Sequence, residues 1–262
     1  MVIGGQISLS IRMIMEDTLD KWLVSDSGIS SAAVRVRMAM RDMKPLTLGE
    51  IAKLTCLKPH NARRAVNELV DVGWLTDLRT PSQRPRLIAP VFPMRVARQM
   101  AREIERAFQD AAHRGEWLMK AQVDLLVGSN NYVDNCRPDW LRNVETKARL
   151  EFDRFFPGFS FVLEYQGAGH HRPTSHGGQL TQEEREQAYR SQLARDAAKL
   201  LACKNRNIEI VYITAIDLLG ESLVAKLPAN IPLSAYAHNP DSPLTQALNA
   251  LARSYAEAVI GN

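Results

Sequence analysis

Residues 149–166 read RLEFDRFFPGFSFVLEYQ, and this stretch decides the fold expected for the C-terminal half of the chain. Polar and apolar residues alternate on both sides of a Pro-Gly pair, which predicts two antiparallel strands joined by a type II turn. If Phe156 pairs with Phe159, Asp153 lies opposite Val162. The alternation predicts a polar face made of Glu151, Asp153, Glu164 and Gln166, and an apolar face made of Phe152, Phe161, Leu163 and Tyr165.

The carboxylates of this hairpin indicate a cation site. Like charges on neighbouring strands destabilise a sheet unless solvent or a cation compensates, so the face is either exposed or a metal site. Carboxylate oxygens suit Mg²⁺ or Mn²⁺. The chain leaves the second strand through Gly167-Ala168-Gly169, which brings His170 and His171 beside the end of that strand. A neutral imidazole next to such a cation can take a proton from water, so this arrangement favours hydrolysis.

An ordered set of sequence pieces resembles the PD-(D/E)xK nuclease superfamily. The pieces are RPDWL at 137–141, LEFD at 150–153, EYQG at 164–167, His170, DAAK at 196–199 and the apolar stretch 208–213. Their order is most similar to the very-short-patch repair (Vsr-like) and EDxHD homing endonuclease branch, over residues 115–216. The resemblance implies a restriction-endonuclease-like α/β domain that cleaves DNA with Mg²⁺ (or Mn²⁺) held by Asp153 and Glu164.

The resemblance also implies roles for individual side chains. Gln166 positions water or phosphate, His170 activates the attacking water, and Glu116 stands where the family has a helix glutamate. Asp196 orients His170 or binds metal, and Lys199 contacts phosphate. Taken alone, Asp196 and Lys199 are neighbours on one helix face, and Glu116 is a common residue of a first helical turn. An ordinary ion pair and a helix start therefore remain the alternatives.

The sequence departs from the family pattern at three positions. Gln166 stands where many members have lysine, Gly169 replaces a glutamine that often precedes the histidine, and His171 replaces an aromatic residue. The third departure leaves open whether His170 or His171 acts.

Upstream of this region, residues 31–90 predict three helices followed by two strands with a basic loop between them. Thr47 and Glu50 have the capping-box spacing before the second helix, Pro59 occupies the first position of the third helix, and Gly73 ends it. This order of elements resembles the winged-helix family of DNA-binding domains. A winged helix used only for protein contacts is the alternative.

Positive charge is concentrated in the same region. Residues 34–102 contain 14 Lys and Arg against 5 Asp and Glu, an excess of nine, whereas the whole chain has a net charge of +4. Such an excess favours contact with a phosphate backbone. The count includes Arg35, Arg37 and Arg41, which lie between apolar residues on the helix expected over 31–43. The residues predicted to bind DNA are Lys58, His60, Asn61, Arg63, Arg64 and Asn67 around the third helix, Arg79, Arg84 and Arg86 in the loop, and Lys199.

The whole sequence predicts a mixed α/β fold in three parts. We expect a winged helix-turn-helix domain with an N-terminal extension over 1–92, a linking helix over 93–114, and an endonuclease-like α/β domain over 115–262. The helix expected over 242–259 is amphipathic, which favours core packing, with homodimer contacts as the alternative. The chain has no apolar run of membrane length, no signal-peptide pattern and three widely spaced cysteines, so we expect a cytoplasmic protein without disulfides.

Together these patterns predict a Mg-dependent endodeoxyribonuclease that a winged-helix domain brings to double-stranded DNA. The alternative is a non-catalytic DNA-binding regulator, or an accessory protein of a mobile element, with a degenerate nuclease fold. The residues leave open the target sequence, RNA as a target, and whether one strand or both strands are cut.

Overall fold

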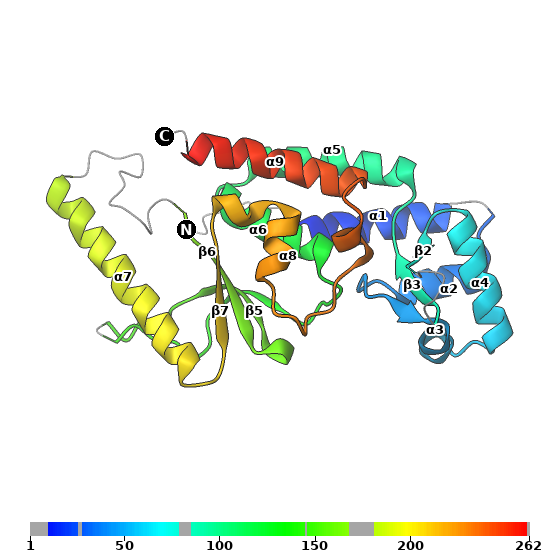
Figure 1. Cartoon of the computed structure of the whole chain (residues 1–262), viewed down its shortest axis with the longest axis horizontal. Helices are drawn as coiled ribbons and strands as arrows, with labels where there is room; N and C mark the ends of the chain where they lie inside the picture. The colour runs from blue at the N-terminus through cyan, green and yellow to red at the C-terminus, as the bar shows by residue number, and fades with distance from the viewer. Residues whose placement is uncertain (1–9, 26–27, 79–84, 145, 168–180, 261–262) are drawn as a thin grey trace, which may run out of the picture.

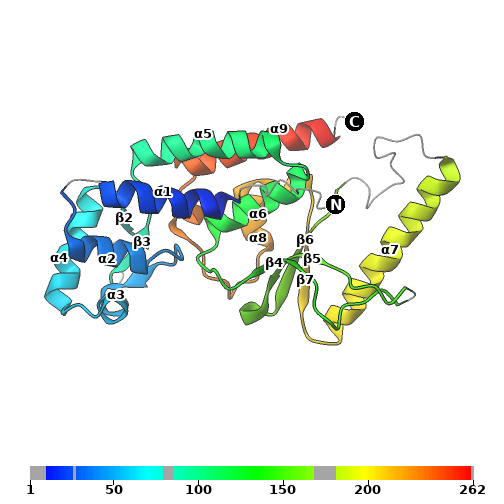
Figure 2. The same ribbon diagram turned by 180° about the vertical axis from the view of Figure 1, so that it is seen from behind.

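The computed structural model describes residues 10–25, 28–78, 85–144, 146–167 and 181–260. These residues form a mixed helix-and-sheet fold with one small sheet in each half of the chain, while α5 and α9 run alongside each other (Figures 1 and 2). The helices are α1 (Ile11–Ser25), α2 (Ser31–Ala39), α3 (Leu48–Thr55), α4 (Pro59–Asp71), α5 (Met94–Asp110), α6 (Arg114–Leu126), α7 (Gln182–Lys204), α8 (Gly220–Lys226) and α9 (Pro243–Ile260). The strands are β1 (Leu46–Thr47), β2 (Leu75–Asp77), β3 (Leu87–Pro90), β4 (Val133–Cys136), β5 (Phe152–Phe156), β6 (Phe161–Tyr165) and β7 (Glu209–Ile213).

The N-terminal part combines α2, α3 and α4 with an antiparallel sheet of order β1-β3-β2. Local signals set the helix ends here. The Thr47 hydroxyl accepts the Glu50 N–H, and the Glu50 carboxylate accepts the Thr47 N–H at 2.7 Å, which is a complete capping box. Pro59 is the first residue of α4, and Gly73 follows that helix with φ of 79°, a conformation that glycine adopts without strain. The capping residues predicted from the sequence are confirmed.

The second sheet has the order β4-β5-β6-β7, with β6 and β7 parallel and the other pairs antiparallel. Helix α6 packs on one face, where Phe156, Phe161 and Leu163 join the main hydrophobic core. Helix α7 packs on the other face over a smaller core that includes Val162 and Cys203. Phe152 also belongs to this smaller core, so its predicted place on the opposite face is wrong. Glu164 is buried and Asp153 is half-buried, whereas the side chain of Glu151 is 36% exposed.

The hairpin register predicted from the sequence is wrong by two residues. Phe156 pairs with Phe161, because a short 3-10 turn follows Phe156 and the residue after that turn has a left-handed φ of 54°. Continuing this register places Asp153 opposite Glu164 instead of Val162. Asp153 and Glu164 nevertheless share one side of the sheet, because both line one hollow with residues of α7.

One hydrophobic core runs through most of the molecule. Its buried residues come from both halves of the chain, including α1, α2, α4, α5, α6 and α9. Helix α9 contacts α5 and α6 and buries Leu244 and Leu248 completely, so core packing is confirmed for this tail helix. The domain limits at 92 and 114 stay a prediction. None of the helices in the described ranges has the length and apolar character needed to cross a bilayer.

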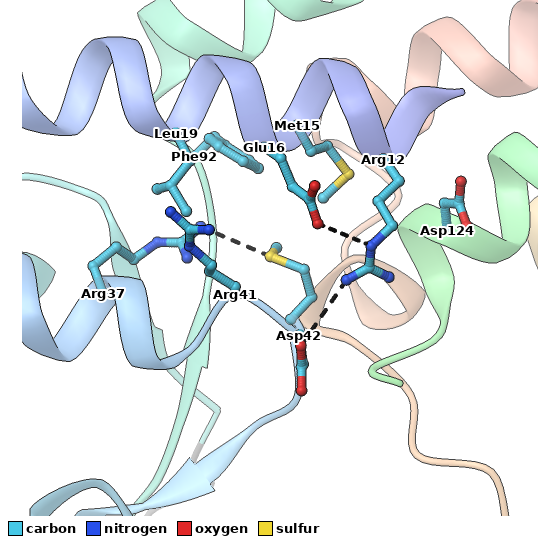
Figure 3. Close-up of a pocket in the computed structure, with 10 residues that line it drawn as sticks. Arg12, Met15, Glu16, Leu19, Arg37, Arg41, Asp42, Phe92 and Asp124 are labelled. Atoms are coloured by element: carbon cyan, nitrogen blue, oxygen red, sulfur yellow. Dashed lines mark hydrogen bonds and ion pairs between the residues drawn. The ribbon is translucent and has the colours of Figure 1, made fainter. Parts of the chain in front are cut away.

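Arg37 does not contribute to the basic surface counted from the sequence. Its side chain is fully buried beside a small cavity of about 20 Å³ (Figure 3), with the guanidinium 5.3 Å from the ring centre of Phe92 and 5.8 Å from that of Trp74. Figure 3 also shows Arg12 across the cavity, where it pairs with Glu16 at 3.2 Å. Burial lowers the pKa of Arg37 to about 10. The charge count therefore includes one arginine that a ligand in solution does not meet.

Candidate active site

Asp153 and Glu164 come from adjoining strands, β5 and β6, and line the same hollow. This hollow has a volume of about 390 Å³ and lies between the second sheet and α7. The side chain of Glu164 is 6% exposed, whereas Asp153 is half-buried. The lining residues are Arg137, Arg149, Leu150, Glu151, Asp153, Glu164, Tyr165, Gln192, Arg195 and Lys199.

The two carboxylates have different partners. The backbone N–H of Tyr165 donates to Asp153 Oδ2 at 2.7 Å. The ammonium of Lys199, on α7, lies 2.6 Å from Glu164 Oε2. The other oxygen of Glu164, Oε1, is buried and has no hydrogen-bond partner among the described residues. A buried acceptor without a donor is rare in native proteins, and it commonly indicates a missing water or ion.

Both carboxylates hold their protons more tightly than exposed ones. Burial, followed by the charge of Asp153, raises the pKa of Glu164 to about 7, although Lys199 acts in the opposite direction. Burial, followed by the charge of Glu116, raises the pKa of Asp153, although the Tyr165 N–H lowers it. Perturbed titratable groups that face a hollow are typical of functional sites.

Helix α6 brings Glu116 into the electrostatic field of this pair. Glu116 is the third residue of α6, and the Lys120 ammonium donates to its Oε1 at 2.5 Å. The negative charge of Glu116 is the second cause of the raised pKa of Asp153, which places Glu116 near the pair. Glu116 nevertheless lines a different hollow, on the α6 side, so the structure brings it near Asp153 without placing it in the same lining.

The start of α6 and the end of β6 meet at Gly115. A Cβ atom at Gly115 would overlap the ring of Tyr165, so glycine is what allows the ring to lie directly on the helix. The hydroxyl groups of Tyr165 and Tyr255 are 3.2 Å apart, which connects β6 to α9. This contact fixes the strand end that carries Glu164.

The remaining predicted residues divide into three groups. Gln166 follows β6 directly, is half-buried, and donates its backbone N–H to Ile213 O at 2.7 Å. Asp196 accepts a hydrogen bond from Gln192 Nε2 at 2.9 Å and is not among the residues that line the hollow. His170 and His171, and with them the predicted base, lie outside the described residues.

Sequence reasoning missed the basic and polar rim of the hollow. Gln192 and Arg195 precede Lys199 by seven and four residues, a spacing that puts all three on one face of α7. That spacing was visible in the sequence and identifies the polar side of the helix. Arg137 was missed for a different reason: it comes from a loop and donates to Glu151 at 2.6 Å, across 14 positions of chain.

Asp153 and Glu164 are of the number and type of protein ligands that commonly bind Mg²⁺ or Mn²⁺. Mg²⁺ is commonly held by one or two carboxylates, while waters and substrate phosphates complete its shell. Within the part of the chain that the structure describes, no group of three or more His, Cys, Asp or Glu side chains could hold a metal. A metal site here would therefore rest on Asp153 and Glu164. The unpartnered Oε1 of Glu164 fits such a site, because a cation would satisfy it.

Helix α4 presents a second polar surface. Six residues predicted to bind DNA are exposed, namely Lys58, His60, Asn61, Arg63, Arg64 and Asn67. Most of them line an open hollow of about 770 Å³ along the helix. Arg86, the residue before β3, donates to Asn67 Oδ1 at 2.9 Å and to Asp77 at 2.8 Å, which ties the start of β3 to α4 and to β2. Arg79 and Arg84 are outside the described residues. Lys199 lies with the carboxylates and not with this group.

No family model and no curated protein matches this sequence. A solved crystal structure, that of RV1404 from Mycobacterium tuberculosis, is similar at 24% sequence identity over 38% of this chain and 70% of that chain. The TM-score of this match is 0.25, and a likeness of that size establishes neither fold nor function.

Proposed function

We propose that the protein is a Mg²⁺- or Mn²⁺-dependent DNA endonuclease, with an N-terminal winged helix-turn-helix that binds DNA and a C-terminal restriction-endonuclease-like α/β domain that hydrolyses phosphodiester bonds. The observation that carries the proposal is the pairing of Asp153 and Glu164 in one hollow, together with the unpartnered Oε1 of Glu164. Clustered, incompletely compensated carboxylates are costly to bury, which favours a functional role over a structural one.

The proposed chemistry needs few protein groups. Asp153 and Glu164 would hold the cation, which when bound polarises a scissile phosphate and stabilises negative charge that develops on it. Lys199, whose ammonium donates to Glu164 at 2.6 Å, would contact a phosphate oxygen of the bound DNA. Gln166 would position water or phosphate by hydrogen bonding. His170 is the residue that we propose to remove a proton from the attacking water, by resemblance to the nuclease family.

The N-terminal part supports the same proposal through its exposed side chains. Arg63, Arg64 and His60 occupy one side of α4, while Ala62, Val66 and other apolar residues of the helix are buried. Long, donor-rich side chains on the third helix of such a unit suit base edges and phosphates. We propose that this face of α4 lies in the major groove of DNA.

Cleavage of supercoiled plasmid tests the proposal directly. Asp153→Asn and Glu164→Gln keep the shapes of both side chains, and each is expected to lower metal-dependent cleavage by at least about a thousandfold. Binding to DNA in EDTA should stay at the level of the unmodified protein. Glu151→Gln is the matched control, because Glu151 lines the same hollow but already pairs with Arg137. If both variants still cut, the proposed metal ligands are wrong.

One observation favours the second candidate, a DNA-binding protein without catalysis. Lys199 neutralises Glu164 at 2.6 Å, which is also what a purely structural ion pair does. In that case the unmodified protein binds DNA, yet the plasmid stays intact with Mg²⁺ and with Mn²⁺. The same plasmid assay therefore separates the two candidates.

A further inference from the structure

The hollow that contains Asp153 and Glu164 carries more positive than negative charge. Its lining includes four basic side chains, from Arg137, Arg149, Arg195 and Lys199, and three carboxylates, from Glu151, Asp153 and Glu164. A divalent cation held by Asp153 and Glu164 would add two further positive charges. Such a concentration of positive charge attracts an anionic ligand such as the phosphate backbone of DNA.

Arg195 differs from the other three basic side chains in its partners. Those three pair with carboxylates, namely Arg137 with Glu151, Arg149 with Asp139, and Lys199 with Glu164. Arg195 donates instead to the side-chain amide oxygen of Gln192, and it makes no ion pair within the described part of the chain. A guanidinium has five N–H donors, so the contact with Gln192 leaves donors for an anionic ligand.

Helix α7 places Arg195 one turn from the carboxylate pair. Arg195 and Lys199 are four residues apart, so they lie on one face of the helix and about 6 Å apart along its axis. Lys199 contacts Glu164, whereas Arg195 lies nearer the N-terminal end of α7, towards which the helix diverges from the sheet (Figures 1 and 2). A phosphate bound at Arg195 is therefore a neighbour of the phosphate at the cation site, and not the same one.

We propose that Arg195 is a positioning residue that binds the DNA phosphate next to the scissile one. The inference rests on the proposed nuclease function and adds a substrate contact to the same site. A guanidinium binds a phosphate through two parallel hydrogen bonds, which fix the orientation of the phosphate as well as its distance. Holding this neighbouring phosphate places the scissile phosphate beside Asp153 and Glu164, so Arg195 acts on the reaction through the position of the substrate.

Steady-state cleavage of a short duplex with a mapped cut site tests this role. Arg195→Gln is expected to raise KM about tenfold and to leave kcat within about threefold, because the lost contact is made equally in the ground state and in the transition state. Arg195→Lys should recover part of the loss, since it keeps the charge but not the two parallel hydrogen bonds. Arg190→Gln is the matched control, because Arg190 is exposed on the same helix and does not line the hollow. The circular dichroism spectrum should be the same for all these variants.

A neutral phosphate in the substrate identifies the contact. Methylphosphonate replaces one phosphate at a time on either side of the cut site. At one position it should raise the KM of the unmodified protein about tenfold and leave that of Arg195→Gln unchanged, because the contact is already absent there. DNA binding in EDTA gives a second measurement that needs neither metal nor cleavage. Arg195→Gln should weaken binding and reduce its salt dependence by about one counterion.

The outcomes separate this inference from the proposed function. An unmodified protein that does not cut DNA with Mg²⁺ or Mn²⁺ would overturn both. If the unmodified protein cuts, three results would each overturn the role of Arg195 alone: an unchanged KM for Arg195→Gln, an equal rise in KM for Arg190→Gln, or a methylphosphonate effect that persists in Arg195→Gln.

Discussion

Arg154 in the C-terminal sheet and Arg37 in the N-terminal part are both fully buried, yet their surroundings are opposite. Arg154 donates to Asp124 and Asp134 at 2.7 Å each. Burial alone would lower its pKa, but the two carboxylates outweigh burial and raise the pKa above its ordinary value. Arg37 packs against aromatic rings, makes no ion pair with a carboxylate of the described ranges, and has its pKa lowered by burial.

The comparison shows how the two regions treat charge. The charged residues of α4 lie on the surface of the N-terminal part, where they stay solvated and carry no desolvation cost. The sheet region instead buries charges as ion pairs, Arg154 with Asp124 and Asp134, and Glu164 with Lys199. The hollow differs from the surroundings of Arg154 because a neighbouring like charge, that of Asp153, raises the pKa of Glu164 there.

The largest expected effect concerns the compensated arginine. Arg154→Met leaves Asp124 buried without its cation, so we expect the free energy of unfolding to fall by about 3–5 kcal/mol. Urea denaturation followed by circular dichroism measures this loss. Adding Asp124→Asn should recover part of the stability, because the unpaired charge is then absent. A loss below about 1 kcal/mol would contradict the description of this network as a compensated one.

The next effect concerns the exposed charges. Arg64→Ala should weaken DNA binding by about tenfold and reduce the salt dependence of binding by about one counterion, because one phosphate or base contact is removed. Fluorescence anisotropy at several salt concentrations measures both quantities. Arg106→Ala, on the exposed side of α5, removes the same charge elsewhere and serves as the control. Equal weakening by both variants would mean that total charge, and not the α4 surface, determines binding.

A pH titration of metal binding examines Glu164. The pKa of Glu164 rises from its ordinary 4.5 to about 7 on folding, so below pH 7 a proton occupies the site and must leave before a cation binds. Mn²⁺ affinity should therefore rise by about tenfold from pH 6 to pH 8 and then level off. Without metal, the same shift makes the folded state less stable as pH rises from 4.5 towards 7. Glu164→Gln should abolish the rise, and a flat profile in the unmodified protein would remove the role given to this carboxylate.

The smallest effect concerns the uncompensated arginine. Arg37→Met leaves no buried carboxylate unpaired and fills a similar volume, so the free energy of unfolding should change by less than about 1.5 kcal/mol. Arg154→Met is measured under identical conditions. The difference between the two losses in free energy of unfolding then gives the contrast between the two regions. Equal losses for the two variants would show that burial alone, and not pairing, sets the contribution of these arginines.

Features that depend on residues close together in the chain could be predicted from the sequence, and features that depend on distant residues could not. The helices of the N-terminal part were predicted because their ends are set by neighbours in the chain, such as Thr47 with Glu50 and Gly73 with its positive φ. The shared face of Asp153 and Glu164 was predicted because alternation along a strand is also local. The register was wrong because the conformation of the turn depends on packing that two residues, Pro and Gly, do not specify.

The surroundings of the carboxylates could not be predicted in the same way. Lys199 meets Glu164 across 35 positions of chain, and no local pattern tells an inward lysine from an outward one. The burial of Arg37 is similar, because its neighbours Trp74 and Phe92 come from distant segments. The N-terminal helix α1 and strand β4 were not anticipated, since neither has a strong periodic pattern.

The contact between Gly115 and Tyr165 has a consequence for the evolution of this chain. The strand that carries Glu164 is spaced from α6 by an aromatic ring lying on a residue without a side chain. A methyl group at position 115 would overlap the Tyr165 ring and displace it. The displacement would disturb the contact between the hydroxyl groups of Tyr165 and Tyr255 on α9. The position of Glu164 thus depends on a residue that has no side chain, and a substitution at Gly115 would move a strand that Gly115 itself does not belong to.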